Sequence, residues 1–111
     1  MASEFAKTKL DRDDQVQRSW IGRYDGKYGF IMLSNKKLLF VEEKGLLHKT
    51  YNLLFEIKYE KIDKVTAEQH FTLLLTETGG TKHTFKSETV VASLIEENLK
   101  KLIDSALMTA V

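Results

Sequence analysis

The periodicity of the hydrophobic residues changes once along this chain of 111 residues, close to Ser87. Before Ser87, short stretches rich in aromatic, leucine and β-branched residues recur with a period near two, separated by glycine or polar clusters, as in consecutive β-strands. After Ser87 the period becomes about 3.6 residues, as in an amphipathic helix. The sequence therefore predicts a run of strands with no intervening helix, followed by one helix near the C-terminus.

Seven strands are predicted before this change. Asp25-Gly26 and Gly79-Gly80 supply tight hairpin turns, because glycine accepts the positive φ that such turns need. The fourth strand alternates most regularly, and only Leu54 breaks its pattern. The second and third strands are apolar on both faces near their centres, which predicts core on one side and another element on the other. The predicted strands are residues 16–24, 28–33, 37–43, 51–59, 62–68, 71–76 and 81–86.

One helix is predicted over residues 88–107, with Ser87 as its N-cap. Its apolar side chains form a single stripe, and the sheet is the only apolar surface that can cover this stripe. The opposite face carries Glu96 and Lys100, an ion pair with the favourable spacing of four residues. The predicted core contains Trp20, Phe40, Phe55, Leu94, Leu99 and Leu102.

The chain has the length of a single domain, which we place at residues 15–108. Residues 1–14 are a polar lead-in that we interpret as a frayed terminus with one loose helical turn around Glu4 to Leu10, rather than as a docking arm. This segment lacks the apolar region of a secretory signal, and no apolar run is long enough to span a bilayer. We therefore expect a cytoplasmic protein that either stays there or contacts a membrane peripherally.

Composition and motifs argue against several classes of function. The chain has no cysteine, so it has neither disulfides nor thiolate chemistry. Its net charge of +1 and its lack of a basic stripe argue against nucleic-acid binding. None of the three histidines has a partner at metal-ligand spacing, and Asp11, Asp13 and Asp14 lack the glycine and glutamate of a calcium-binding loop. We expect no enzymatic activity, no cofactor, no metal site and no small-molecule substrate.

Three short motifs carry a family resemblance. Gly29–Val41 is similar to a hairpin in which a strand ends in Thr-Asn-Lys-Arg-Leu and continues into Leu-Phe-Val, with Ser34 and Lys37 standing for the threonine and arginine. Tyr59–Val65 is similar to a Tyr-x-x-Ile-x-x-Val corner, and Phe85 matches an aromatic position in the last strand. Together with the order of elements, these motifs resemble the pleckstrin-homology (PH)-like superfold and, within it, the bacterial PH and GRAM families.

This resemblance implies a mainly β (α+β) fold. Seven antiparallel strands would form a half-open barrel of two nearly orthogonal sheets, and the C-terminal amphipathic helix would cap one open end. A barrel of the lipocalin kind would need about eight longer strands and an empty interior. Because the aromatic side chains and the helix stripe fill the interior here, we expect no central pocket.

The resemblance also implies a binding module, for which two interpretations remain open. The first is protein interaction or scaffolding, with a protein partner or a second copy bound at a strand edge or in the groove beside the helix. The alternative is weak binding of an anionic lipid or phosphoinositide headgroup at the first hairpin loop. Basic residues flank that loop, although Asp25 lies in it, and a rival patch would combine Lys82 and Lys86 with two lysines of the next turn. The candidate ligand-binding residues are Arg18, Arg23, Lys27, Lys36 and Lys37.

Overall fold

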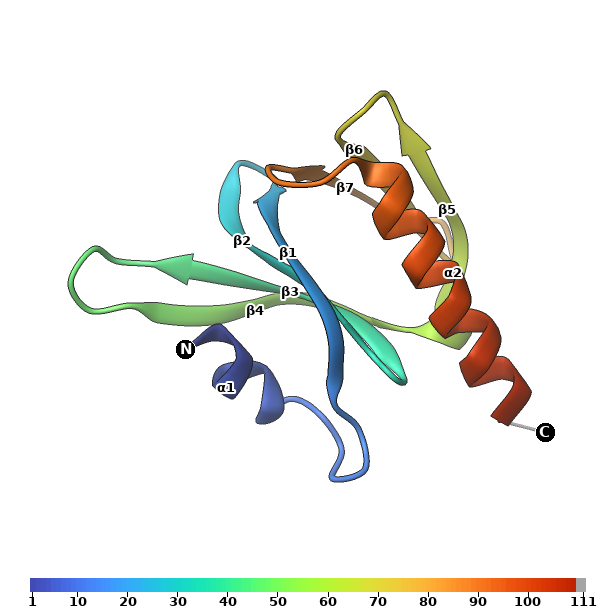
Figure 1. Ribbon diagram of the computed structural model, residues 1–111, viewed down its shortest axis with the longest axis horizontal. Helices are drawn as coiled ribbons and strands as arrows, with labels where there is room; N and C mark the ends of the chain where they lie inside the picture. The colour runs from blue at the N-terminus through green and yellow to red at the C-terminus, as the bar shows by residue number, and fades with distance from the viewer. Residues whose placement is uncertain (110–111) are drawn as a thin grey trace.

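The computed structural model describes residues 1–109 and contains seven strands, two α-helices and one 3-10 turn (Figure 1). The strands start and end within about one residue of the expected positions. In chain order the elements are α1 (Ala2–Lys7), β1 (Val16–Tyr24), β2 (Lys27–Ser34), β3 (Lys37–Lys44), β4 (Thr50–Lys58), η1 (Tyr59–Lys61), β5 (Ile62–Glu68), β6 (Thr72–Glu77), β7 (Lys82–Ser87) and α2 (Ala92–Thr109).

All strand pairs are antiparallel, in the order β4-β3-β2-β1-β7-β6-β5. The meander β1–β4 and the meander β5–β7 are joined only where the end of β1 pairs with the end of β7, over Gly22–Tyr24 and Phe85–Ser87. The two expected sheets are therefore one continuous hydrogen-bonded sheet. Since β4 and β5 do not pair, the sheet does not close into a barrel. The seven antiparallel strands and the C-terminal helix confirm the predicted PH-like architecture.

Two local features of the sheet, a β-bulge in β4 and a close crossing at Gly22, follow from single residues. Leu54 lies between Leu53 and Phe55, which pair with consecutive residues of β3, so it is the extra residue of a β-bulge. The bulge explains why Leu54 alone breaks the alternation of its strand. At the joint between the two meanders, a Cβ added to Gly22 would lie 2.3 Å from the Phe85 ring, so this crossing requires glycine.

The main core lies between the sheet and α2, which packs on β5 and β6 along one side of the molecule (Figure 1). Phe40 and Leu99 are fully buried there, and Trp20, Phe55 and Leu102 pack against the same cluster. Leu94 was expected in this core but is exposed. Successive helical residues are about 100° apart, so a helix that buries Ile95 turns Leu94 away from the sheet.

The last helix begins at Ala92, four residues later than predicted from the assumed N-cap at Ser87. Ser87 still belongs to β7, where it pairs with Gly22. Its hydroxyl oxygen accepts the Val90 N–H and so closes a turn instead of capping a helix. The β-branched run 89–91 has low helix propensity, which favours this later start.

A second apolar cluster lies on the opposite face of β2 and β3. Here α1 packs against the sheet and buries Ala6 completely against Met32, Leu39 and Val41. The interpretation of the N-terminal segment as a frayed end is therefore wrong for its first seven residues. The apolar outer faces of β2 and β3 are explained by this helix, the additional element that their pattern predicted.

Candidate functional site

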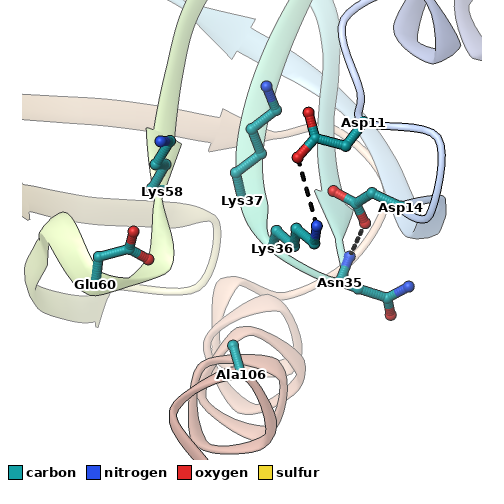
Figure 2. Close-up of a pocket in the computed structure, with 8 residues that line it drawn as sticks. All are labelled: Asp11, Asp14, Asn35, Lys36, Lys37, Lys58, Glu60 and Ala106. Carbon is teal, nitrogen blue, oxygen red and sulfur yellow. Dashed lines mark hydrogen bonds and ion pairs between the residues drawn. The ribbon is translucent and has the colours of Figure 1, made fainter. Parts of the chain in front are cut away.

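A hollow of about 430 Å³ lies where the β2–β3 turn, the end of β4 with η1, and the C-terminal part of α2 meet (Figure 2). Lys36, Lys37 and Lys58 line it together with Asn35. Acidic groups come from the segment before β1 and from η1, and Ala106 of α2 forms its floor in Figure 2. We call this site the turn–helix groove; its remaining lining residues are Asp11, Asp14 and Glu60.

The β2–β3 turn that carries the lysines is fixed by a network of hydrogen bonds. Ser34 donates its hydroxyl proton to the Asp14 carboxylate at 2.7 Å, and the same carboxylate accepts the Asn35 N–H at 2.8 Å. The Ser34 hydroxyl oxygen also accepts the Lys37 N–H at 3.0 Å. Beneath the turn, the buried Tyr59 donates its hydroxyl proton to the Ser34 carbonyl oxygen. Segments far apart in sequence thus hold the turn in one shape.

Carboxylates neutralise two of the three lysines. Lys36 Nζ lies 2.9 Å from Asp13 and 3.4 Å from Asp11, and Figure 2 shows the second of these ion pairs. The hydrogen bond from Lys36 lowers the pKa of Asp13, and the same bond raises the pKa of Lys36. Lys37 Nζ lies 3.3 Å from Glu56 on β4. Lys58 forms no ion pair within residues 1–109.

The other candidate residues do not reach this groove. Lys27 begins β2 and Ser34 ends it, so the first hairpin loop and the groove lie about 23 Å apart along the strand. Arg23 Nε donates to Glu88 at 2.8 Å, and Arg18 Nε donates to Asn98 at 3.3 Å. The structure therefore places Arg23 and Lys27 at the first hairpin and Lys36 and Lys37 at the groove, whereas Arg18, which pairs with Leu33 near the start of β1, belongs to neither place.

The rival lysine patch is not assembled in the groove either. Lys86 pairs with Arg23 across the joint of the two meanders. Lys82 lines a separate hollow over β5–β7. Neither residue lines the turn–helix groove beside Lys36 and Lys37.

A buried polar chain near the joint between the meanders was not predicted from the sequence. His83 Nε2 lies 2.6 Å from the Glu77 carboxylate, and its Nδ1 lies 2.9 Å from the Tyr24 hydroxyl. The carboxylate requires a donor, so neutral His83 carries its proton on Nε2 and accepts the Tyr24 hydroxyl proton at Nδ1. Its ring stacks on Phe55 with centroids 4.2 Å apart. The available signal was a histidine at an inward-facing strand position, beside Phe85 in the alternation.

Two kinds of functional feature, a metal-binding cluster and a membrane-spanning helix, are absent from residues 1–109. No cluster of three or more histidine or acidic residues there is arranged to hold a metal ion. No helix in the described chain is long and apolar enough to cross a membrane.

Comparison with known proteins agrees with the fold. The chain is similar to a solved structure, the C-terminal domain of an unknown protein from Leishmania infantum, with a TM-score of 0.61 and 12% sequence identity. The similarity covers 93% of this chain and 91% of that one. No curated protein matches the sequence. The Bacterial PH domain family matches residues 10–106, nearly the whole folded part. The chain therefore belongs to the bacterial PH domain family.

Proposed function

We propose that this chain is a non-catalytic binding module that holds a segment of a protein partner in the turn–helix groove. Membership of the bacterial PH domain family supports a binding role. The groove adds a hollow of about 430 Å³ lined by charged side chains from three separate parts of the chain and by Ala106 of α2. A polypeptide segment suits such a groove, because its backbone and side chains offer both donors and acceptors.

The charge balance of the groove carries this proposal. Its three lysines are outnumbered by five carboxylates, of which three line the groove and two pair with its lysines: Asp11, Asp13, Asp14, Glu56 and Glu60. A phosphate headgroup would meet net repulsion here. A peptide with basic or uncharged polar side chains would not.

The polar groups of the structure also support a role without catalysis. Both ring nitrogens of His83, the one buried histidine of residues 1–109, are engaged by Tyr24 and Glu77. A base with both nitrogens occupied has none free for a substrate. His48 and His70 lie exposed in loops. No nucleophile–base pair accompanies either of them among the described contacts.

Headgroup binding at the first hairpin receives less support. Arg23 is already bound to Glu88, so a headgroup would have to displace this partner. Arg18 pairs with Leu33 at the other end of β1 and lies away from the loop. Lys27 stands next to Asp25 and Gly26 in the turn. Of the candidate residues at this loop, only Lys27 has no ion pair within residues 1–109, and it lies close to an acidic residue, which predicts weak association.

Selection from a random peptide phage library tests the proposal. We expect enrichment of peptides rich in lysine or arginine. Ala106→Trp, which fills the groove, should weaken their binding at least about tenfold by calorimetry because the peptide would lose its contact surface. The matched control is Lys101→Trp on the exposed face of the same helix, which should bind as the native chain does.

Three results would count against this function. Peptides that bind the Ala106→Trp variant as well as the native chain would place their site elsewhere. No enrichment at all would remove the support for a peptide partner. Saturable NMR shifts around Lys27 on titration with inositol hexakisphosphate, with none at Lys58, would favour the headgroup alternative.

A further inference from the structure

The tip of the β3–β4 hairpin exposes two adjacent leucines. Leu46 is 94% exposed and Leu47 is 93% exposed, whereas the other exposed large apolar residues within 1–109 are at most 78% exposed. Figure 1 shows this hairpin extending away from the body of the molecule, well beyond the other strands. We call residues 44–49 the leucine tip.

The shape of the tip is defined by its backbone. The two strands stay paired up to Lys44 and Thr50, so the hairpin arms remain hydrogen-bonded partners as far as the turn. Gly45 has a φ of +102°, and a Cβ added there would lie 2.1 Å from the His48 carbonyl oxygen. Only glycine fits this turn, and the turn leaves both leucines outside it. The two leucines are therefore presented by a closed hairpin turn.

Basic side chains surround the leucines, and the nearest acidic ones are withdrawn. The side chains of Lys44 and Lys49 are 60% and 46% exposed, whereas those of Glu42 and Glu43 are 6% and 16% exposed. The lysines lie 3.9 Å and 3.6 Å from these carboxylates, separations at the long end for ion pairs. Positive charge thus reaches solvent at the leucine tip, and negative charge stays against the body.

We propose that the leucine tip inserts into the surface of a bilayer that contains anionic lipids. Leu46 and Leu47 would enter the boundary between headgroups and acyl chains, and the lysines on either side would contact phosphates. Lysine suits this position because its aliphatic stem tolerates apolar surroundings while its ammonium stays at the headgroups. A convex tip with a cationic base fits a planar anionic surface better than it fits a protein pocket. This site lies at the opposite end of β3 from the turn–helix groove, so it adds a second surface to the proposed function.

Co-sedimentation with vesicles tests the proposal. The probes are vesicles of phosphatidylcholine alone and vesicles in which about a third of the lipid is phosphatidylserine. We expect the native chain to sediment with the anionic vesicles and to be released by salt. The double variant Leu46→Ser with Leu47→Ser should bind at least about tenfold more weakly, because it loses the inserted apolar surface.

Folding is not at issue for this variant, since both leucines are almost fully exposed, and unchanged thermal melting would show it. The matched control replaces Leu107 and Met108, an exposed apolar pair at the end of α2, by serine and should sediment as the native chain does. A second readout uses Leu46→Trp. Its fluorescence, after subtraction of the Trp20 signal, should shift to shorter wavelength with anionic vesicles.

Several results would overturn the proposal. One is equal sedimentation of the native chain and the double serine variant, and another is no sedimentation at low salt. Light scattering that shows a dimer lost in the double serine variant would assign the tip to a second copy of the chain. Because Ala106→Trp leaves the tip intact, its vesicle binding should be native, so failure of the groove proposal and failure of this one are distinguishable.

Discussion

Replacing Tyr59 by phenylalanine tests the buried support of the turn–helix groove. The Tyr59 side chain is 1% exposed, and its hydroxyl donates to the Ser34 carbonyl oxygen. The phenylalanine ring keeps the packing but leaves this buried acceptor without its donor. We expect the free energy of unfolding to fall by about 1–2 kcal/mol near neutral pH.

The same hydroxyl gives this difference a dependence on pH. Burial, and after it the nearby Asp14 carboxylate, raises the pKa of Tyr59 above its ordinary value. Above about pH 10 the unfolded chain therefore loses a proton that the folded chain retains. Because the unfolded state then binds fewer protons, the native chain loses about 1.4 kcal/mol of stability per pH unit relative to the variant. The two stability curves should cross at about pH 11.

Urea denaturation between neutral pH and about pH 12, followed by Trp20 fluorescence, measures both curves. All other ionisable groups are shared by the two proteins, so their difference isolates Tyr59. A difference that stays constant over this range would show that the hydroxyl ionises without penalty in the folded state. Equal stability at neutral pH would show that its hydrogen bond contributes nothing.

Three further substitutions test single contacts. Gly22→Ala places a Cβ 2.3 Å from the Phe85 ring and should lower the free energy of unfolding by about 1–3 kcal/mol, measured by urea denaturation. An unchanged urea midpoint would show that the joint of the two meanders can shift to accept the methyl group. Asp14→Asn should lower the free energy of unfolding by about 1 kcal/mol because it weakens the hydrogen bonds from Ser34 and Asn35. The exposed Asp11→Asn should lower it by less than about 0.5 kcal/mol, and equal effects would contradict this assignment. Hydrogen bonds from Lys100 and from the Ala67 N–H hold the pKa of Glu96 below its ordinary value, so the stability that Glu96 adds is lost as the pH falls below about 4. In urea denaturation, Glu96→Gln should therefore lose less stability than the native chain as the pH is lowered, and equal losses would contradict the contact.

Strand positions were predictable because their signals are local. Alternating side chains, Asp25-Gly26 and Gly79-Gly80 mark both the strands and the turns between them. The β-bulge in β4 is also visible in the sequence, because Leu54 interrupts an otherwise regular alternation. The later start of α2 was also encoded locally, in a β-branched run that the apolar stripe of the helix concealed.

The position of α1 could not be derived from its own residues. Ala2 and Ala6 are small, and charged neighbours give their segment the composition of a free terminus. The evidence lay elsewhere, in the second apolar face of β2 and β3, which the sequence showed without showing what covers it.

The groove was predicted only in part. Lys36 and Lys37 stood out as basic neighbours in a turn. Their carboxylate partners come from the segment before β1 and from β4, and only the folded topology brings these together. The sequence shows the lysines and the carboxylates, but it does not show that they form ion pairs with one another.

The packing of α1 on the sheet affects how a shortened form of this protein would behave. The family match begins at residue 10, after α1 has ended at Lys7. A chain shortened to that match would uncover Met32, Leu39 and Val41 beside β4, whose outer edge no strand pairs with. Exposed apolar surface next to an open strand edge favours edge-to-edge association, so we expect the shortened protein to aggregate more readily than the full chain.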